Sequence, residues 1–416
     1  MRSRWVSRCT SCGRALPPLA LSCPQCPRAL PRSDYAERRF VVGDREDLFR
    51  FSSWLPCAST VKTEVGPRVV KGRRLAAALG LDALWIAFNG YAPEWGALNP
   101  TGTFKDFEAL PTLLHLREHG KEEIVLASAG NTARAFAHAA TVLDMAAVLV
   151  VPEALTPLVW SPLPVSDSVR LVSVRDADYA GSIALAGAIA DRWGLASEGG
   201  ARNVARRDGM ATAMLEYARI TGELPRHYVQ AIGSGTGAIA AWEACLRLQG
   251  GGGFSGPLPR LHLAQNAPFA PIHEAWDQGQ EISVPGDERE VLRTIDELAA
   301  PVLANRNPPY ALVGGVRDAL LETRGRTYAV DNAAIAEAQV LFEASEGVPV
   351  GPEGGAALAA LRDAVGRGWI PRGDSVLLHV TGNGDAVLRR ASRLWPVPIW
   401  RTVSLSQGIP AALASL

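Results

Sequence analysis

One lysine of the chain stands where its amine could do covalent chemistry. Lys105 follows the turn-forming residues Asn99 to Gly102, lies between Phe104 and Asp106, and opens an apolar stretch that predicts a buried helix. A lysine at a helix start is normally solvated. Burial and neighbouring charges instead lower the pKa of the amine, which makes it a better nucleophile. The position of Lys105 therefore raises the question of whether its amine is reactive, and of which bound molecule it would react with.

A glycine-rich loop between a strand and a helix is the first candidate for that partner's site. In "AIGSGTGAIAAW", residues 231–242, the glycines leave backbone amides free to point at a phosphate, and the helix N-terminus adds partial positive charge. The third glycine of a dinucleotide fingerprint would fall at Ala238, so a single small phosphate fits better than a dinucleotide. A plain glycine turn stays open for this motif alone. The residues expected to hold the phosphate are Gly233, Ser234, Gly235, Thr236 and Gly237.

Two further loops follow expected strands and carry small polar side chains. The first opens a helix and is suited to a carboxylate; it contains Ser128, Ala129, Gly130, Asn131 and Thr132. The second, "HVTGNGDA", places Thr381 just after a strand. Each loop alone is a weak signal, because helix starts of this composition are common. Together with a lysine and a phosphate cradle, however, they supply the groups that a pyridoxal phosphate enzyme needs, in which the lysine forms a Schiff base with the cofactor aldehyde.

The elements that must position these loops alternate between strand and helix from about residue 80 onward. Residues 122–128 and 169–177 read as buried strands, and the stretches after them read as amphipathic helices. Such alternation predicts an α/β protein with parallel sheets covered by helices on both faces. Ligands of these folds bind outside the carboxyl ends of the strands, where the polar loops lie.

Four of the six cysteines are concentrated near the N-terminus. Cys9 and Cys12 form one C-x-x-C pair, Cys23 and Cys26 form another, and ten residues separate the pairs. This spacing is typical of a four-cysteine zinc knuckle, and we expect a structural zinc because four thiolates leave no open coordination position. Reduced cysteines in a disordered tail are the alternative. Residues 1–40 otherwise show no clear helix or strand period.

Composition excludes several classes of partner. Lys+Arg and Asp+Glu both number 42, so the net charge is zero and no overall field attracts nucleic acid or an anionic membrane. No apolar run approaches the ~20 residues that cross a bilayer, and the N-terminus lacks the apolar core of a signal peptide. We therefore expect a cytoplasmic protein without nucleic-acid or membrane partners that acts on a small molecule.

The motifs also occur in a known order. "NPTGTFKDFEA", "ASAGNTARAFA", "AIGSGTGAIAAW", "LAQNAPFAPI" and "VTGNG" resemble, in order and spacing, the threonine-synthase branch of fold-type II pyridoxal phosphate enzymes. The resemblance implies two doubly wound parallel-sheet domains with the cofactor between them, in a catalytic unit of residues 41–416 with a smaller subdomain at roughly 110–200. It further implies that Lys105 bonds to the cofactor, Asn131 binds the ring hydroxyl, Thr381 faces the ring nitrogen, residues 233–237 hold the phosphate, and residues 128–132 hold the substrate carboxylate.

Within this branch, the lysine loop departs from threonine synthases. They typically read "FKDRG", whereas this chain has Phe107 and Glu108 at the last two positions. "GTFKDFEA", "FSSWLP" and "LFEASEGVPVGPEGGAAL" are instead similar to cysteate synthases. That similarity implies β-replacement on O-phospho-L-serine by sulfite, which gives L-cysteate and phosphate. The alternatives are a threonine synthase acting on O-phosphohomoserine, a relative that adds another nucleophile, and a zinc-containing binding protein on a degenerate enzyme fold.

Two expectations concern the surroundings of the site. The two anions of the implied reaction need receivers, and arginine is a natural one. Arg134, Arg206 and Arg207 are candidates, but helix arginines are mostly exposed, so we expect these three to be solvated. From the resemblance we also expect a homo-oligomer, a dimer or higher.

Overall fold

The larger of the two main sheets positions two of the predicted loops, the glycine loop and the loop that contains Thr381. The computed structural model describes residues 4–284 and 286–416. Strand β4 runs antiparallel to β5 at one edge of this sheet, and the other neighbouring strands are parallel. In spatial order the strands are β15 (Arg326–Val330), β14 (Arg260–Asn266), β13 (His227–Ala231), β16 (Ser375–Val380), β5 (Ala83–Phe88) and β4 (Arg68–Lys71).

The smaller sheet has five strands, and all of its pairings are parallel. The strands expected at residues 122–128 and 169–177 are its β8 and β11. Apolar residues, three of them valine, fill the central strand at residues 146–152, as expected for a strand buried on both faces. In spatial order the strands are β12 (Ala196–Ser197), β8 (Glu123–Ala127), β9 (Ala146–Pro152), β11 (Val169–Arg175) and β18 (Ile399–Ser404).

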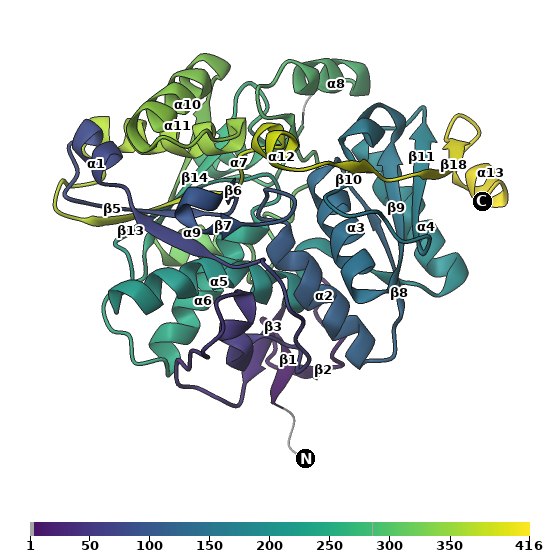
Figure 1. The fold of residues 1–416 in the computed structure, drawn as a ribbon, viewed down its shortest axis with the longest axis horizontal. Helices are drawn as coiled ribbons and strands as arrows, with labels where there is room; N and C mark the ends of the chain where they lie inside the picture. The colour runs from purple at the N-terminus through teal and green to yellow at the C-terminus, as the bar shows by residue number, and fades with distance from the viewer. Residues whose placement is uncertain (1–3, 285) are drawn as a thin grey trace.

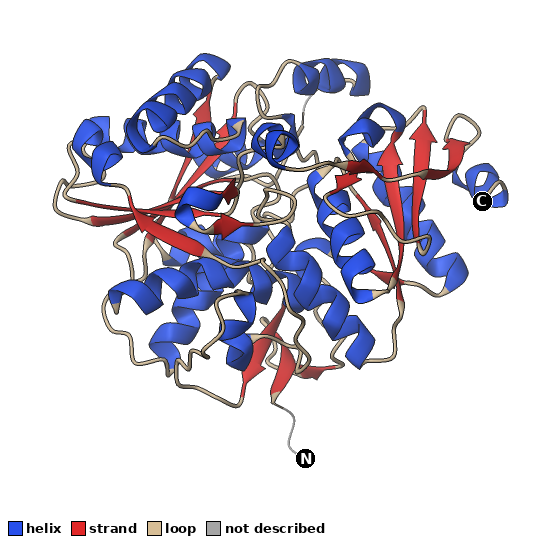
Figure 2. Ribbon diagram, viewed as in Figure 1, coloured by secondary structure: helices blue, strands red, loops and turns tan. Residues whose placement is uncertain are grey.

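Helices cover both faces of each sheet, which confirms the predicted α/β class (Figures 1 and 2). One face of the larger sheet carries α1 (Arg73–Leu79), α10 (Asn332–Glu346) and α11 (Pro352–Gly366). Helices on its other face are α5 (Val204–Thr221), α6 (Thr236–Gly250) and α9 (Val316–Glu322). Packed on the smaller sheet are α3 (Asn131–Leu143) and α4 (Tyr179–Trp193). The other α-helices are α2 (Asp106–Glu118), α7 (Pro271–Gln278), α8 (Glu288–Asp296), α12 (Ala386–Ala391) and α13 (Ile409–Ala414).

The contact between α2 and α5 is unusually close. A Cβ atom built on Gly209 of α5 would lie 2.0 Å from the backbone oxygen of Phe107 and 3.0 Å from Cγ of Pro111, both on α2. Only glycine fits there, so this residue sets the distance between the two helices. Because Lys105 immediately precedes α2, the same contact brings the first turn of α5 to the lysine.

The N-terminal segment contains a small sheet that the sequence pattern did not reveal. Strands β1 (Trp5–Cys9), β2 (Ala15–Leu16) and β3 (Pro31–Tyr35) pair antiparallel in the order β2-β1-β3. The sequence of residues 1–40 shows no clear period, yet residues 5–35 include these strands; residues 1–3 lie outside the described chain. These strands are short and carry arginine, serine and cysteine in place of apolar residues, so hydrophobic alternation is missing.

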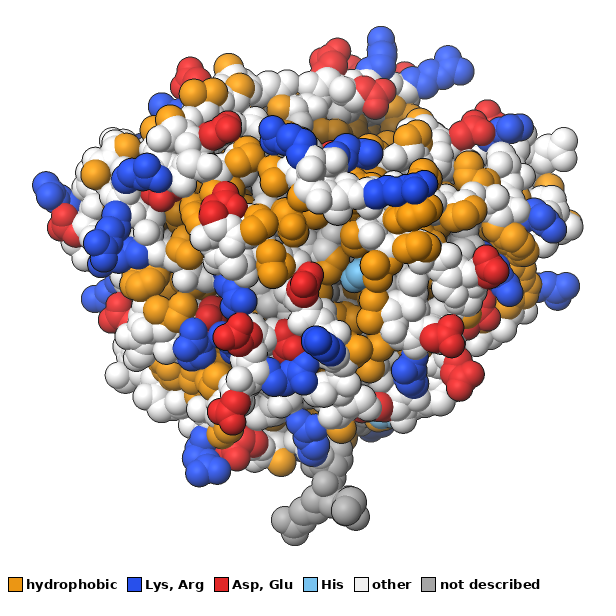
Figure 3. Space-filling model, viewed as in Figure 1, with side chains coloured by type: hydrophobic (Ala, Val, Ile, Leu, Met, Phe, Trp, Pro, Cys, Tyr) orange, Lys and Arg blue, Asp and Glu red, His pale blue; other side chains and the backbone are white. Residues whose placement is uncertain are grey.

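Charged side chains of both signs are mixed over the face seen in Figure 3, consistent with the zero net charge. Within residues 4–284 and 286–416, no helix has the length and apolar character needed to cross a membrane.

Candidate active site

The predicted site residues meet in one cavity between the two sheets. Three of the four loops leave the carboxyl ends of β8, β13 and β16, where α/β folds bind ligands. The cavity is also lined by the turn before α2. The sequence-predicted residues that line it are Lys105, Ser128, Ala129, Asn131, Thr132, Gly233, Ser234, Gly235, Thr236, Gly237 and Thr381. Among the residues predicted to bind cofactor or substrate, Gly130 is the one that does not line the cavity.

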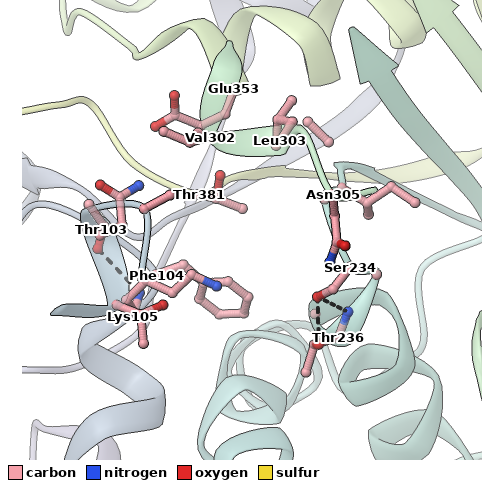
Figure 4. Close-up of a pocket in the computed structure, with 18 of the residues that line it drawn as sticks. Thr103, Phe104, Lys105, Ser234, Thr236, Val302, Leu303, Asn305, Glu353 and Thr381 are labelled. Atoms are coloured by element: carbon pink, nitrogen blue, oxygen red, sulfur yellow. Dashed lines mark hydrogen bonds between the residues drawn. The ribbon is translucent and has the colours of Figure 1, made fainter. Parts of the chain in front are cut away.

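Lys105 sits at the N-terminus of α2 and is tied to the loop after β16. The backbone N–H of Phe104 donates to the carbonyl of Thr381 at 2.7 Å, and Thr103 forms an antiparallel bridge with Gly382. The buried side chain of Asn99 fixes the turn before it by donating to the carbonyl of Gly90 at 3.1 Å. These contacts hold Lys105 and Thr381 on the same wall of the cavity (Figure 4).

The amine of Lys105 lies at the cavity wall beside a buried acid. Its Nζ is 3.6 Å from Oε2 of Glu108, whose side chain is completely buried. Burial lowers the pKa of Lys105, while the carboxylate of Glu108 opposes that decrease. Burial also raises the pKa of the neighbouring Asp106 to about 7, although Asp106 accepts hydrogen bonds from Thr101. The expectation of a lysine with a lowered pKa agrees with this geometry.

The glycine loop opens α6 on the opposite side of the cavity from Lys105 (Figure 4). Gly235 has φ +79°, and a Cβ there would lie 2.3 Å from the side chain of Val316. A Cβ on Gly237 would lie 2.5 Å from Gln230. The hydroxyls of Ser234 and Thr236 are 2.8 Å apart at the helix N-terminus. Unhindered amides and two hydroxyls at a positive helix end make a receptor for a small anion.

The loop after β8 is ordered by its own serine. The hydroxyl of Ser128 accepts hydrogen bonds from the backbone N–H groups of Gly130 at 3.0 Å and Ala133 at 2.9 Å. Gly130 has φ +129°, which a residue with a side chain rarely adopts, so its role is to turn the chain. Asn131 and Thr132 begin α3 and line the cavity.

The expectation of solvated arginines was wrong for all three candidates. Arg134 is 7% exposed, donates to the side-chain oxygen of Asn131 and lies over the ring of Trp160. Arg206 is 7% exposed, lines the cavity and pairs with Glu108.

Arg207 is 1% exposed and binds the carboxylate of Glu243 at 2.9 Å. It also donates to the carbonyl of Pro31 in β3, and so ties the N-terminal sheet to α5 and α6. All three errors have the same physical cause, which is tertiary packing. Helices α3 and α5 are covered by neighbouring elements along most of their length, so these three arginines are buried; Arg206 and Arg207 pair with acids there.

Several lining residues carried no signal that the sequence analysis used. Tyr179 and Met210 come from α4 and α5, Glu353 from α11, and residues 302–305 from the segment before α9. Glu353 was visible in "GPEGGAAL" as an acid in the first turn of a helix next to glycines, which is the one pattern that could have identified it.

The four N-terminal cysteines gather as the spacing predicts. Their sulfur atoms all lie within 4.8 Å of one another, and Sγ of Cys12 is 3.8 Å from that of Cys23. Four thiol sulfurs at this separation are a donor set suited to tetrahedral zinc. Next to them, the hydroxyl and backbone N–H of Thr10 donate to the carbonyl of Leu30, at 2.9 and 3.0 Å, and the hydroxyl also reaches the carbonyl of Val313 at 2.9 Å.

Removing the metal is expected to destabilise the protein. The cysteine group fixes the β1–β3 connection, which holds Val313, and Val316 three residues later packs against the glycine loop. A Cys23→Ser variant should lose its metal, and its thermal midpoint should fall by roughly 5 °C or more. Elemental analysis and thermal unfolding measure the two effects. Cys57→Ala removes a buried thiol outside the cluster and should keep the metal; freshly purified protein without metal would contradict the assignment.

Comparison with known proteins identifies the class. Residues 96–382 match the family model described as "Pyridoxal-phosphate dependent enzyme". These residues contain the lysine, both anion-binding loops and Thr381. The chain is a pyridoxal-phosphate dependent enzyme.

Relatives over nearly the whole chain narrow the class further. The chain is 43% identical over 404 residues to cysteate synthase of Methanosarcina acetivorans, covering 96% of this chain and 97% of the relative. It is 45% identical over 383 residues to cysteate synthase of Methanothrix thermoacetophila, covering 91% of each. It therefore belongs to the cysteate synthase family.

Solved structures show the same fold at low sequence identity. Tomato (Solanum lycopersicum) threonine deaminase isoform 2 superposes with a TM-score of 0.58 at 16% identity, over 84% of this chain and 93% of that one. Escherichia coli diaminopropionate ammonia lyase gives the same TM-score and identity over 85% of this chain and 94% of that one.

The residues present fit pyridoxal phosphate. Lys105 lines the cavity, and 27% of its side chain is exposed there. On the other side, Cβ atoms at Gly235 and Gly237 would clash with Val316, Gln230 and Phe104, so only glycine fits at these two positions of the lining loop. A primary amine facing a phosphate receptor is the donor set that this cofactor requires.

Proposed function

We propose that this protein makes L-cysteate and phosphate from O-phospho-L-serine and sulfite. One observation carries the proposal: Lys105, the glycine loop, the loop after β8 and Thr381 line a single cavity in a member of the cysteate synthase family. Overall, the Cβ–O bond to phosphate breaks and a Cβ–S bond to sulfite forms. The α-hydrogen leaves and is replaced during the reaction.

Four groups of residues would hold the cofactor and the substrate. Lys105 would bond to the cofactor, and residues 233–237 would receive its phosphate through backbone amides and the hydroxyls of Ser234 and Thr236. Asn131 would bind the ring hydroxyl and Thr381 would face the ring nitrogen. The substrate carboxylate would bind at the N-terminus of α3, at residues 128–132, where the helix dipole favours an anion.

Bound pyridoxal phosphate supplies an electron sink for breaking bonds at the substrate α-carbon. In its free-amine form, Lys105 would accept the α-proton as general base, since it lines the cavity and burial lowers its pKa toward a neutral amine. Phe104 and Met210 contribute apolar surface to the same cavity.

Phosphate release tests the proposal directly. Purified protein with cofactor would be given O-phosphoserine or O-phosphohomoserine, each with and without sulfite. Sulfite-dependent release from phosphoserine, with cysteate as product, is the expected result. Release from phosphohomoserine alone would make the protein a threonine synthase. Consumption of phosphoserine that sulfite does not affect would indicate another nucleophile.

We further propose the organisation of the whole molecule. Residues 1–40 form a zinc-binding module and residues 41–416 the catalytic unit, with a smaller subdomain at roughly 110–200; the separate sheets and the cysteine cluster support this division.

A cytoplasmic location is supported by cysteines grouped for metal binding, which suits a reducing compartment. The expectation of a homo-oligomer rests on the resemblance to fold-type II enzymes, and sedimentation would test it.

A further inference from the structure

Glu108 is a fully buried acid placed between two cations. Its Oε2 is 3.6 Å from Nζ of Lys105 and 2.9 Å from Nε of Arg206. Its side chain has no solvent exposure, and that of Arg206 is 8% exposed. A buried carboxylate is unfavourable unless cations compensate its charge. The surrounding elements must therefore hold both cations close to Glu108.

The surrounding elements fix Arg206 before it meets Glu108. Asn203 caps α5 by accepting hydrogen bonds from the backbone N–H groups of Ala205 and Arg206, at 2.9 and 3.3 Å. Nη1 of Arg206 donates to Glu198, whose other oxygen accepts from the backbone N–H of Gly200 at 3.0 Å. The guanidinium is therefore held through Nη1, and its Nε lies 2.9 Å from Oε2 of Glu108.

Charged and titratable groups from each neighbouring element face this pair. Arg206 comes from α5, Glu198 from the turn after β12, Tyr179 from α4 and Lys105 from the start of α2. With Lys105 and Arg206 protonated and both glutamates ionised, the formal charges cancel. Burial raises the pKa of Glu108, and the two cations oppose that rise. A change in the charge of Lys105 therefore changes the electrostatic energy of the Glu108 carboxylate.

We propose that Glu108, fixed by Arg206, is a positioning residue for Lys105. The carboxylate of Glu108 holds the ε-amine of Lys105 at the cavity wall and favours the protonated form of that amine. This proposal rests on the proposed role of Lys105 as general base. The amine that takes the α-proton becomes an ammonium inside a buried cavity, where an isolated charge is unfavourable. A carboxylate at 3.6 Å offsets that cost and makes Lys105 the stronger base.

The first readout needs no turnover. Apoprotein of the full chain would be mixed with pyridoxal phosphate over a range of pH, and the rate of cofactor capture followed by its visible absorbance. Only the neutral amine attacks the aldehyde. Glu108→Gln keeps the shape and removes the charge, so Lys105 should lose its proton more easily. We expect the midpoint of the rate profile to move down by about one pH unit or more.

The second readout should move in the opposite direction. Exchange of the α-hydrogen of L-alanine with solvent deuterium depends on Lys105 as a base, and L-alanine carries no leaving group. In Glu108→Gln this exchange should fall about tenfold, while cofactor capture becomes faster at low pH. Glu108→Asp restores the charge and should return the midpoint toward that of the natural protein.

A matched control and two contrary outcomes complete the test. Glu118→Gln makes the same substitution at the far end of α2, where the side chain binds the backbone of residues 58 and 59, and should leave the pH midpoint unchanged. An unchanged midpoint in Glu108→Gln, or a parallel fall in both rates, would overturn the proposal. Failure of the natural apoprotein to capture cofactor at Lys105 would instead overturn the proposed function.

Discussion

Lys105→Ala is expected to reduce phosphate release from O-phosphoserine by at least about a thousandfold. The variant loses the amine that would bond to the cofactor and, once free, accept the α-proton. Both losses concern the same atom, and of the residues that the structure describes, Lys105 is the one lysine that lines the cavity, so no neighbouring amine replaces it. The visible absorbance of the bound cofactor should change as well, because the covalent bond to the protein is lost.

The control for this prediction is Lys121→Ala. Lys121 is exposed beyond the end of α2 and lies outside the cavity. Its replacement should leave both phosphate release and absorbance unchanged. A Lys105→Ala enzyme with substantial sulfite-dependent activity would contradict the assignment. A variant that binds cofactor without the covalent bond and gains activity with an added small amine would support it.

The fold was predictable because its strands are buried on both faces. In β9, residues 146–152, a nearly continuous apolar run has no polar alternation to obscure it. Such a run followed by a small polar loop and a helix fits few folds other than a parallel α/β sheet. The N-terminal strands lack this signal because they are short and pair around a cysteine cluster, which holds them in place of a hydrophobic core.

The loops of the site were predictable, but their charged support was not. Lysine, glycine and small polar residues at strand ends are visible one motif at a time, and the strand order then brings them together. The partners of Lys105 are different: Glu108 follows it on α2, whereas Arg206 and Glu198 come from elements about ninety to one hundred residues away. Sequence periodicity does not specify which helix faces another, so Arg206 was expected to be solvated.

The geometry that places Arg206 beside Glu108 leads to a prediction about a residue with no side chain. Gly209 lies one turn after Arg206 on α5, where it meets the backbone of Phe107 on α2. Gly209→Ala would put a Cβ 2.0 Å from that carbonyl oxygen, and backbone cannot move aside as a side-chain tip can. The helices would have to separate, and we expect a loss of about 2–4 kcal/mol in the free energy of unfolding, measured by denaturant titration.

Gly187→Ala is the matched control, because it makes the same change inside a helix without the close contact. Gly187 lies within α4, and a Cβ there would meet no atom within 4 Å. Alanine favours helix over glycine, so this variant should gain about 0.5–1 kcal/mol. If Gly209→Ala were as stable as Gly187→Ala, the close packing of α2 on α5 would be wrong. If the loss is observed, cofactor capture by the Gly209→Ala apoprotein should also slow, because separation of the helices withdraws Arg206 from Glu108 and leaves the acid beside Lys105 without its second cation.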